Sequence, residues 1–195
     1  MDRRDFLGRG LKLGAASALA AVGLPTPVLA QSAAQSVAQG SGFDLTRGSR
    51  VLSLVRPEAG ERLHLEYLRD GQWVDDAYNR LCWLLRDIHV NQHVAMDPEL
   101  IGVLDWTQSY LGHYGYTRPL QILSGYRSQY TNQRLENAAK NSMHLYGKAI
   151  DLRVPGLSAE YLGRLFWWMG RGGVGIYTRS EFVHIDTGAI RAWRG

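Results

Sequence analysis

The chain has 195 residues, of which 22 are Lys or Arg and 18 are Asp or Glu, so its formal charge is +4. Hydrophobic residues make up 45% and charged residues 21% of the sequence. This is ordinary globular composition, which excludes long disorder, collagen and a polytopic membrane protein. The length predicts one domain, and the basic balance at first favours nucleic acid or an anionic surface as a partner.

The first 30 residues have the features of an export signal. The segment Arg3-Arg4-Asp5-Phe6-Leu7 is similar to the twin-arginine motif, and an apolar run from Leu13 to Leu24 follows it. A run of roughly 12 residues is too short to span a bilayer, which takes about 20, but it fits the core of a signal peptide. Val28-Leu29-Ala30 then offers small residues for cleavage. We therefore expect residues 1–30 to be a twin-arginine-type signal peptide, with a retained tethering helix as the alternative.

Removal of this signal changes the meaning of the charge. Four basic and two acidic residues leave with it, so the charge falls from +4 to +2 on the remaining 165 residues. No basic cluster remains, so we expect no nucleic-acid partner, no membrane span and a periplasmic location. The single cysteine, Cys82, lies in an apolar stretch and is expected to be a buried thiol, since one cysteine makes no internal disulfide.

The elements are predicted in chain order as follows. Residues 31–42 are rich in Ala, Gln, Ser and Gly and are expected to be a flexible leader to one domain over residues 43–195. Alternating apolar residues predict strands at Arg50–Arg56 and Glu61–Arg69, joined as an antiparallel hairpin.

Beyond this hairpin, helical spacing and caps predict four helices, and short apolar runs predict four strands. The helices are expected over residues 75–89, 97–114, 132–141 and 158–170, and the strands over residues 121–124, 149–154, 174–177 and 182–186. Helices come early and strands late, with turns too short for βαβ crossovers. This order favours an α+β fold with a small antiparallel sheet flanked by helices.

Two histidines stand apart from the others in their sequence context. His144 precedes Asp151 by seven residues across Gly147, and His184 lies on the last predicted strand. Because side chains alternate along a strand, Asp151 and His184 become neighbours if their two strands pair. Gly147 lets the preceding loop fold back and bring His144 to them, so two imidazoles and one carboxylate are expected to meet.

Two histidines and one carboxylate form a zinc-binding set that leaves a fourth position for water. The ion lowers the pKa of that water toward about 7 and polarises a carbonyl group. The same ligand set also binds iron. The spacing is equally compatible with two structural histidines that form ordinary hydrogen bonds and bind no metal. The spacing alone leaves these alternatives open.

The motifs around these residues resemble a known family. The segment from Ser142 to Asp151 matches the pattern S-x-H-x-x-G-x-A-x-D of the zinc D-Ala-D-Ala metallopeptidases, whose superfamily includes lysostaphin-type endopeptidases and the hedgehog N-terminal domain. A closer resemblance is to exported bacterial proteins that were once a domain of unknown function and are similar to murein endopeptidases. It includes Ser124-Gly125-Tyr126-Arg127-Ser128, Asn132 to Leu135, and the run from Phe182 to Gly188. The resemblance covers about residues 47–195.

The resemblance implies that His144, Asp151 and His184 bind Zn²⁺ and that the substrate is the stem peptide of peptidoglycan. It also implies that Arg127 faces the site, where it would hold a substrate carboxylate or stabilise an oxyanion; a salt bridge that fixes the loop is the alternative. For the general base, Glu181 stands three residues before His184, where related carboxypeptidases place a Glu, and Asp186 shares a strand face with His184. A third alternative is that neither serves.

These observations predict an exported, zinc-dependent peptidoglycan peptidase that hydrolyses stem-peptide or cross-link amide bonds as an endopeptidase or carboxypeptidase. The alternative is a non-catalytic, metal-containing module of the same fold that binds the cell wall. The sequence specifies neither the bond that is cleaved nor an oligomeric state.

Overall fold

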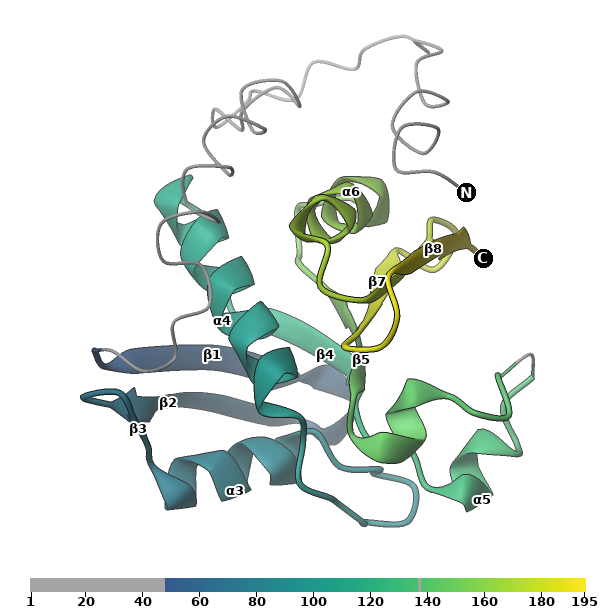
Figure 1. Ribbon diagram of the computed structural model, residues 1–195, viewed down its shortest axis with the longest axis horizontal. Coiled ribbons are helices and arrows are strands. Elements are labelled where there is room, and N and C mark those ends of the chain that lie inside the picture. The colour runs from purple at the N-terminus through teal and green to yellow at the C-terminus, as the bar shows by residue number, and fades with distance from the viewer. Residues whose placement is uncertain (1–47, 137) are drawn as a thin grey trace, which may run out of the picture.

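The computed structural model describes residues 48–136 and 138–195 of the chain, as one sheet with helices packed on it (Figure 1). The predicted signal peptide, the leader and the first residues of the predicted domain lie outside the described residues. None of the helices in the described ranges has the length and apolar character needed to cross a bilayer.

The first part of the fold is the predicted hairpin. Strands β1 (Arg50–Arg56) and β2 (Glu61–Arg69) pair antiparallel around the short helix η1 (Pro57–Ala59). Both strands match their predicted bounds. A two-residue strand, β3 (Gln72–Trp73), extends the sheet beyond β2, and it is too short to give a pattern in the sequence.

Two helices follow the hairpin. Helix α3 (Asp75–Leu84) ends five residues before the predicted limit, because the Arg56 side chain binds the carbonyls of Leu84 and Arg86. Helix α4 (Pro98–His113) begins as predicted, with the Asp97 carboxylate accepting a hydrogen bond from the Glu99 backbone N at 2.9 Å.

The second part of the fold is richer in strands. It contains β4 (Leu120–Ser124), α5 (Gln129–Asn132), η2 (Met143–Tyr146), β5 (Ala149–Arg153), α6 (Ala159–Met169), β6 (Gly173–Tyr177), β7 (Phe182–Asp186) and β8 (Arg191–Arg194). The helix predicted over residues 132–141 is wrong. The Ser128 hydroxyl caps a helix that has already ended at Asn132, whose side-chain amide donates to Ala139 O and closes an irregular loop.

The α+β class is confirmed, but the prediction of a small antiparallel sheet is wrong. The sheet has eight strands in the order β3-β2-β1-β4-β5-β7-β6-β8, and it is mixed, since β1 pairs parallel with β4 and β6 parallel with β8. The connection from β1 to β4 contains β2, β3, α3 and α4, which is long enough for a parallel return. Strand β8 reaches the free edge of β6 after the β6–β7 hairpin.

The helices and the sheet enclose the core. Helix α3 packs on β2, α4 on β1, and α6 on β6 and β7. Along β5 and β7 the residues Ile150, Leu152, Val183 and Ile185 are buried in this core. The residues that alternate with them point to the other face of the sheet, and they carry the polar cluster described next.

Candidate metal centre

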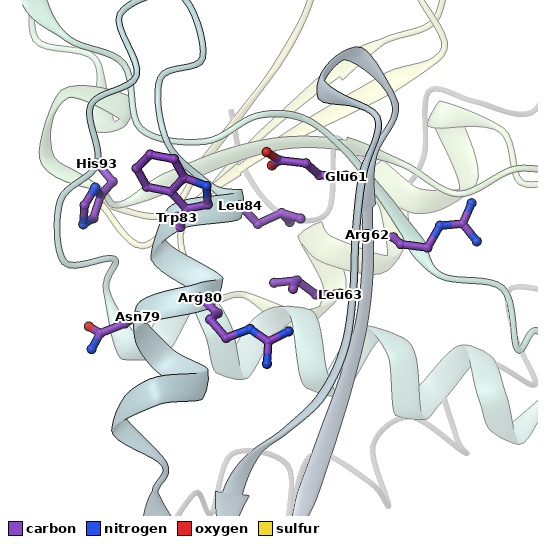
Figure 2. Close-up of a pocket in the computed structure, with 8 residues that line it drawn as sticks. All are labelled: Glu61, Arg62, Leu63, Asn79, Arg80, Trp83, Leu84 and His93. Carbon is purple, nitrogen blue, oxygen red and sulfur yellow. The ribbon is translucent and has the colours of Figure 1, made fainter.

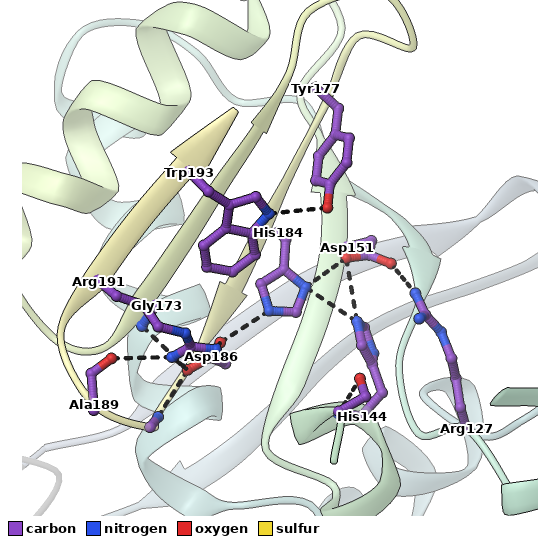
Figure 3. Close-up of polar contacts among 12 residues, drawn as sticks. Arg127, His144, Asp151, Gly173, Tyr177, His184, Asp186, Ala189, Arg191 and Trp193 are labelled. Carbon is purple, nitrogen blue, oxygen red and sulfur yellow. Dashed lines mark hydrogen bonds and ion pairs between the residues drawn. The ribbon is translucent and has the colours of Figure 1, made fainter. Parts of the chain in front are cut away.

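Two neighbouring strands and one short helix position the three predicted ligands. Strands β5 and β7 pair antiparallel with Asp151 directly opposite His184. The Ser142 hydroxyl caps η2, and Gly147 ends it in a left-handed conformation with φ 66°, which suits a residue without a Cβ atom. This tight turn places His144 over the two strand residues, as the sequence predicted (Figure 3).

The three candidate ligand atoms are close together and buried. His144 Nε2 lies 3.2 Å from Asp151 Oδ1 and 3.1 Å from His184 Nδ1, and His184 Nδ1 lies 2.9 Å from Asp151 Oδ1. The residues are 1%, 6% and 8% exposed for His144, Asp151 and His184. Ligands held at about 2.0–2.1 Å around a tetrahedral zinc ion lie about 3.3 Å apart, so the spacing suits such an ion.

The outer nitrogen of each imidazole already has a partner. His144 Nδ1 lies 2.6 Å from the Gly125 carbonyl oxygen, which only accepts, so Nδ1 donates. His184 Nε2 lies 2.9 Å from Asp186 Oδ2 and donates to that carboxylate. In the neutral rings the inner nitrogens therefore carry lone pairs. Two lone pairs and a carboxylate oxygen then face one another, an arrangement that needs a cation or a proton between them.

The pKa values of all three residues are shifted, His144 and Asp151 downward and His184 upward. Burial lowers the pKa of His144, although Asp151 acts against this. Burial also disfavours the charged form of His184, but hydrogen bonds to Asp151 and Asp186 outweigh it and raise the pKa of His184. Burial acts to raise the pKa of Asp151, yet the two imidazoles hold that pKa well below its usual range. Asp151 is therefore a permanent anion at the centre of the cluster.

Arg127 lies beside this anion. Its Nη2 donates to Asp151 Oδ2, and its Nε donates to the Ser124 hydroxyl at 2.9 Å. Its backbone N also donates to His144 O at 3.1 Å, which ties the loop to η2. Within the described chain Nη1 has no hydrogen bond. Arg127 thus makes the salt bridge that the sequence analysis gave as an alternative role. Its Nη1 is still available to a ligand.

Asp186 lies across the His184 ring from the ligand atoms, so it is not beside them. It accepts hydrogen bonds from Arg191 Nη2 at 2.6 Å and from the backbone N of Gly173 and Gly188. Burial acts to raise its pKa, but these donors and His184 hold the pKa of Asp186 well below its usual range. Its contacts suit a residue that orients His184, and its predicted role as a base stays a prediction.

Trp193 covers the other side of His184. The centroids of the two rings lie 5.1 Å apart, and Trp193 Nε1 donates to the Tyr177 hydroxyl at 3.0 Å (Figure 3). Gly175 makes this close approach possible, because a Cβ atom there would lie 2.7 Å from the indole ring. The aromatic side chain thus limits the movement of the His184 ring.

Glu181 is exposed and has contacts elsewhere. It adopts φ 51°, and its carboxylate lies 3.4 Å from the backbone N of Ala159, the first residue of α6. Within the described part of the chain its carboxylate makes no hydrogen bond to His144, Asp151 or His184. The structure thus brings together Arg127, His144, Asp151, His184 and Asp186 and leaves Glu181 at the start of α6.

This position gives the predicted base a direct test. We expect Glu181→Gln to retain kcat/KM on the cross-linked peptidoglycan that the sequence motifs imply as substrate, because the change removes only a charge near the start of a helix. Steady-state rates at several pH values would check this. A large loss of kcat with an unchanged melting temperature would instead establish Glu181 as the base.

Two contributors to the site were not identified from the sequence. Arg191 holds Asp186, and the Gly125 carbonyl orients His144. A backbone carbonyl has no sequence signal. Arg191 and Trp193 lie on β8, a strand that was not predicted. If that strand had been recognised and paired with β6, its alternate residues Arg191 and Trp193 would have been expected near His184 on β7.

Comparisons with known proteins find relatives that are named as peptidoglycan endopeptidases. A family model described as peptidoglycan L,D-endopeptidase MepK matches residues 44–193. The curated peptidoglycan L,D-endopeptidase MepK of Escherichia coli (strain K12) is 33% identical over 197 residues, which covers 99% of this chain and 100% of the relative. A protein named probable peptidoglycan L,D-endopeptidase MepK from Haemophilus influenzae is 35% identical over 150 residues, 75% of this chain and 80% of the relative. No solved structure matched significantly.

Proposed function

This chain belongs to the peptidoglycan L,D-endopeptidase MepK family, and from that membership we propose that it is a zinc-dependent endopeptidase that cleaves L,D peptide cross-links of peptidoglycan. The observation that carries this proposal is the convergence of three buried ligand atoms whose outer partners are already in place. We also propose that residues 1–30 direct export by the twin-arginine route and that the enzyme acts in the periplasm.

The residues present fit a zinc ion. His144, Asp151 and His184 would hold it with two nitrogen atoms and one oxygen atom, and both imidazoles have the outer hydrogen bond that is usual for metal-bound histidines. When bound, zinc acts as a Lewis acid and lowers the pKa of water toward about 7.

The chain itself supplies binding and orientation. Arg127 Nη1 is available to donate to the scissile carbonyl oxygen as negative charge develops there, while Nη2 keeps Asp151 in position. Asp186 keeps the proton of His184 on Nε2, and the Gly125 carbonyl keeps the proton of His144 on Nδ1. Trp193, held by its hydrogen bond to Tyr177, packs on the His184 ring and bounds that side of the site.

A digestion experiment tests the proposal. The zinc-loaded domain is incubated with purified peptidoglycan that contains both L,D and D,D cross-links, and the muropeptides are separated and identified by mass. We expect loss of L,D cross-linked dimers and gain of monomers, with D,D dimers unchanged, and no reaction after chelation. Intact cross-links together with tight co-sedimentation on peptidoglycan would favour the non-catalytic alternative, a module that binds the cell wall. One observation supports that alternative: among the described residues, no carboxylate other than Asp151 contacts the three ligand atoms.

A further inference from the structure

A small cavity adjoins the candidate metal centre. It has a volume of about 180 Å³, and its lining includes Arg127, which binds Asp151, and Ser124, which accepts a hydrogen bond from Arg127. Arg56, at the end of β1, also lines the cavity, as do the carboxylates Glu58 and Asp87. A substrate at the metal centre would therefore extend naturally into this space.

Arg56 is an unusual residue to find in the wall of a cavity. It is 3% exposed, and burial lowers its pKa. Its Nη1 donates to the carbonyls of Leu84 and Arg86, the second of which is a very short contact. Its Nε has no hydrogen-bond partner and is shielded from solvent. Within residues 48–136 and 138–195 its Nη2 makes no hydrogen bond either, so Nη2 is the guanidinium nitrogen that is left for a ligand.

Arg56 also has no ion-pair partner within the described ranges, although carboxylates lie near it. Glu61 is bound by Arg86 through two hydrogen bonds of 2.9 Å each. Asp87 accepts from Ser128 N, Ser128 Oγ and His89 N. Glu58 is exposed and forms no ion pair with Arg56 in the described chain, although the charges of Glu58, Glu61 and Asp87 act to raise the pKa of Arg56 against its burial. Buried charges in proteins are normally paired, because an uncompensated one is costly. The missing partner of Arg56 is therefore expected to be an anion that enters the cavity.

We propose that this cavity is a carboxylate-binding subsite of the substrate cleft and that Nη2 of Arg56 receives the carboxylate. The proposal rests on the proposed function for the identity of the substrate, a peptidoglycan stem peptide with free carboxylates. A charge-assisted hydrogen bond from the planar guanidinium group to a carboxylate oxygen is stronger than one between neutral groups. Arg127 does not compete for this role, since its Nε and Nη2 are bound to Ser124 and Asp151.

The kinetic test compares two substrates on the same enzyme. One is a cross-linked stem-peptide dimer with free carboxylates, and the other is the same dimer with these carboxylates amidated. We expect the unmodified chain to prefer the free carboxylate by roughly 10- to 100-fold in kcat/KM, the usual range for hydrogen bonds to a charged group. In Arg56→Gln the preference should fall to near 1. The ratio is independent of how much of the variant is folded, so loss of the carbonyl contacts at Leu84 and Arg86 does not obscure the result.

Two further variants serve as controls. Arg80→Gln removes an exposed arginine from a separate groove of about 440 Å³ between β2 and α3 (Figure 2), and it should leave the preference unchanged. Arg56→Lys keeps the positive charge but lacks the planar fork, and it should retain only part of the preference.

A binding measurement separates this proposal from the proposed function. N-acetyl-D-alanine and its amide are titrated into the zinc-loaded protein by calorimetry. Binding of the acid but not the amide, lost in Arg56→Gln and kept in Arg80→Gln, supports the subsite even if no cross-link is hydrolysed. Equal binding by Arg56→Gln and the unmodified chain, no binding of the acid, or an unchanged substrate preference in Arg56→Gln would overturn it.

Discussion

Replacement of His144 by alanine is expected to remove bound zinc and to lower kcat/KM by at least about 10³-fold, because the change deletes one of three ligands from a group that acts as a unit. His144 is 1% exposed and its Nε2 lies within 3.2 Å of both other ligand atoms. No other described side chain contacts that position in a way that would replace it. Chelation of the unmodified chain should give the same loss, and this loss should reverse when zinc is returned.

The measurement is zinc content per chain beside the rate of cross-link hydrolysis. His113→Ala is the matched control, since His113 is an exposed histidine at the end of α4 and its ring contacts Tyr114, away from the candidate ligands. Full zinc occupancy and an unchanged rate in His144→Ala would show that the histidines have a structural role and that the metal centre is wrongly assigned.

The second large effect is expected at Asp186. An asparagine there has nearly the same shape but presents an NH₂ group in place of one carboxylate oxygen, toward either His184 Nε2 or Arg191. If the amide donates to Nε2, the proton of His184 moves to Nδ1 and blocks the ligand atom. We expect zinc affinity to fall by roughly 10- to 100-fold, the usual cost of losing such a partner.

Saturating zinc distinguishes positioning from proton transfer at this residue. If Asp186 only orients His184, the rate of Asp186→Asn should recover most of its value once zinc is in excess. If Asp186 is the general base, the rate should stay low at full occupancy, with the acidic limb of the pH profile altered. Arg191→Gln is a milder control, because it leaves the contact between Asp186 and His184 in place.

The strands and the convergence of His144, Asp151 and His184 could be predicted because their signals are local. Alternation defined β1 and β2 over nine residues or fewer, and the face shared by Asp151 and His184 follows from the two-residue period of a strand. The sequence spacing around Gly147 indicated the tight turn that brings His144 inward. In each case one short segment contains the whole pattern.

Two of the errors share a physical cause, which is contact between distant segments. Helix α3 ends early because Arg56, from β1, binds the carbonyl of Leu84, the last residue of α3, and that of Arg86 beyond it. The parallel pairing of β1 with β4 depends on a long connection and has no local pattern. The unpaired Nη2 of Arg56 also has no sequence signal, since an arginine at the end of a strand normally reaches solvent or an acidic partner.

The three ligands sit on parts of the fold with different local stability. Asp151 and His184 are on strands that have hydrogen-bonded neighbours on both sides, whereas His144 is on a short 3-10 helix held by a hydroxyl cap and a left-handed glycine. Interior strands open only with large parts of a domain, while short connecting segments open locally and more often. Exchange of the ion with solvent should therefore proceed through release of His144 first, at a rate set by the opening of η2 and not by global unfolding.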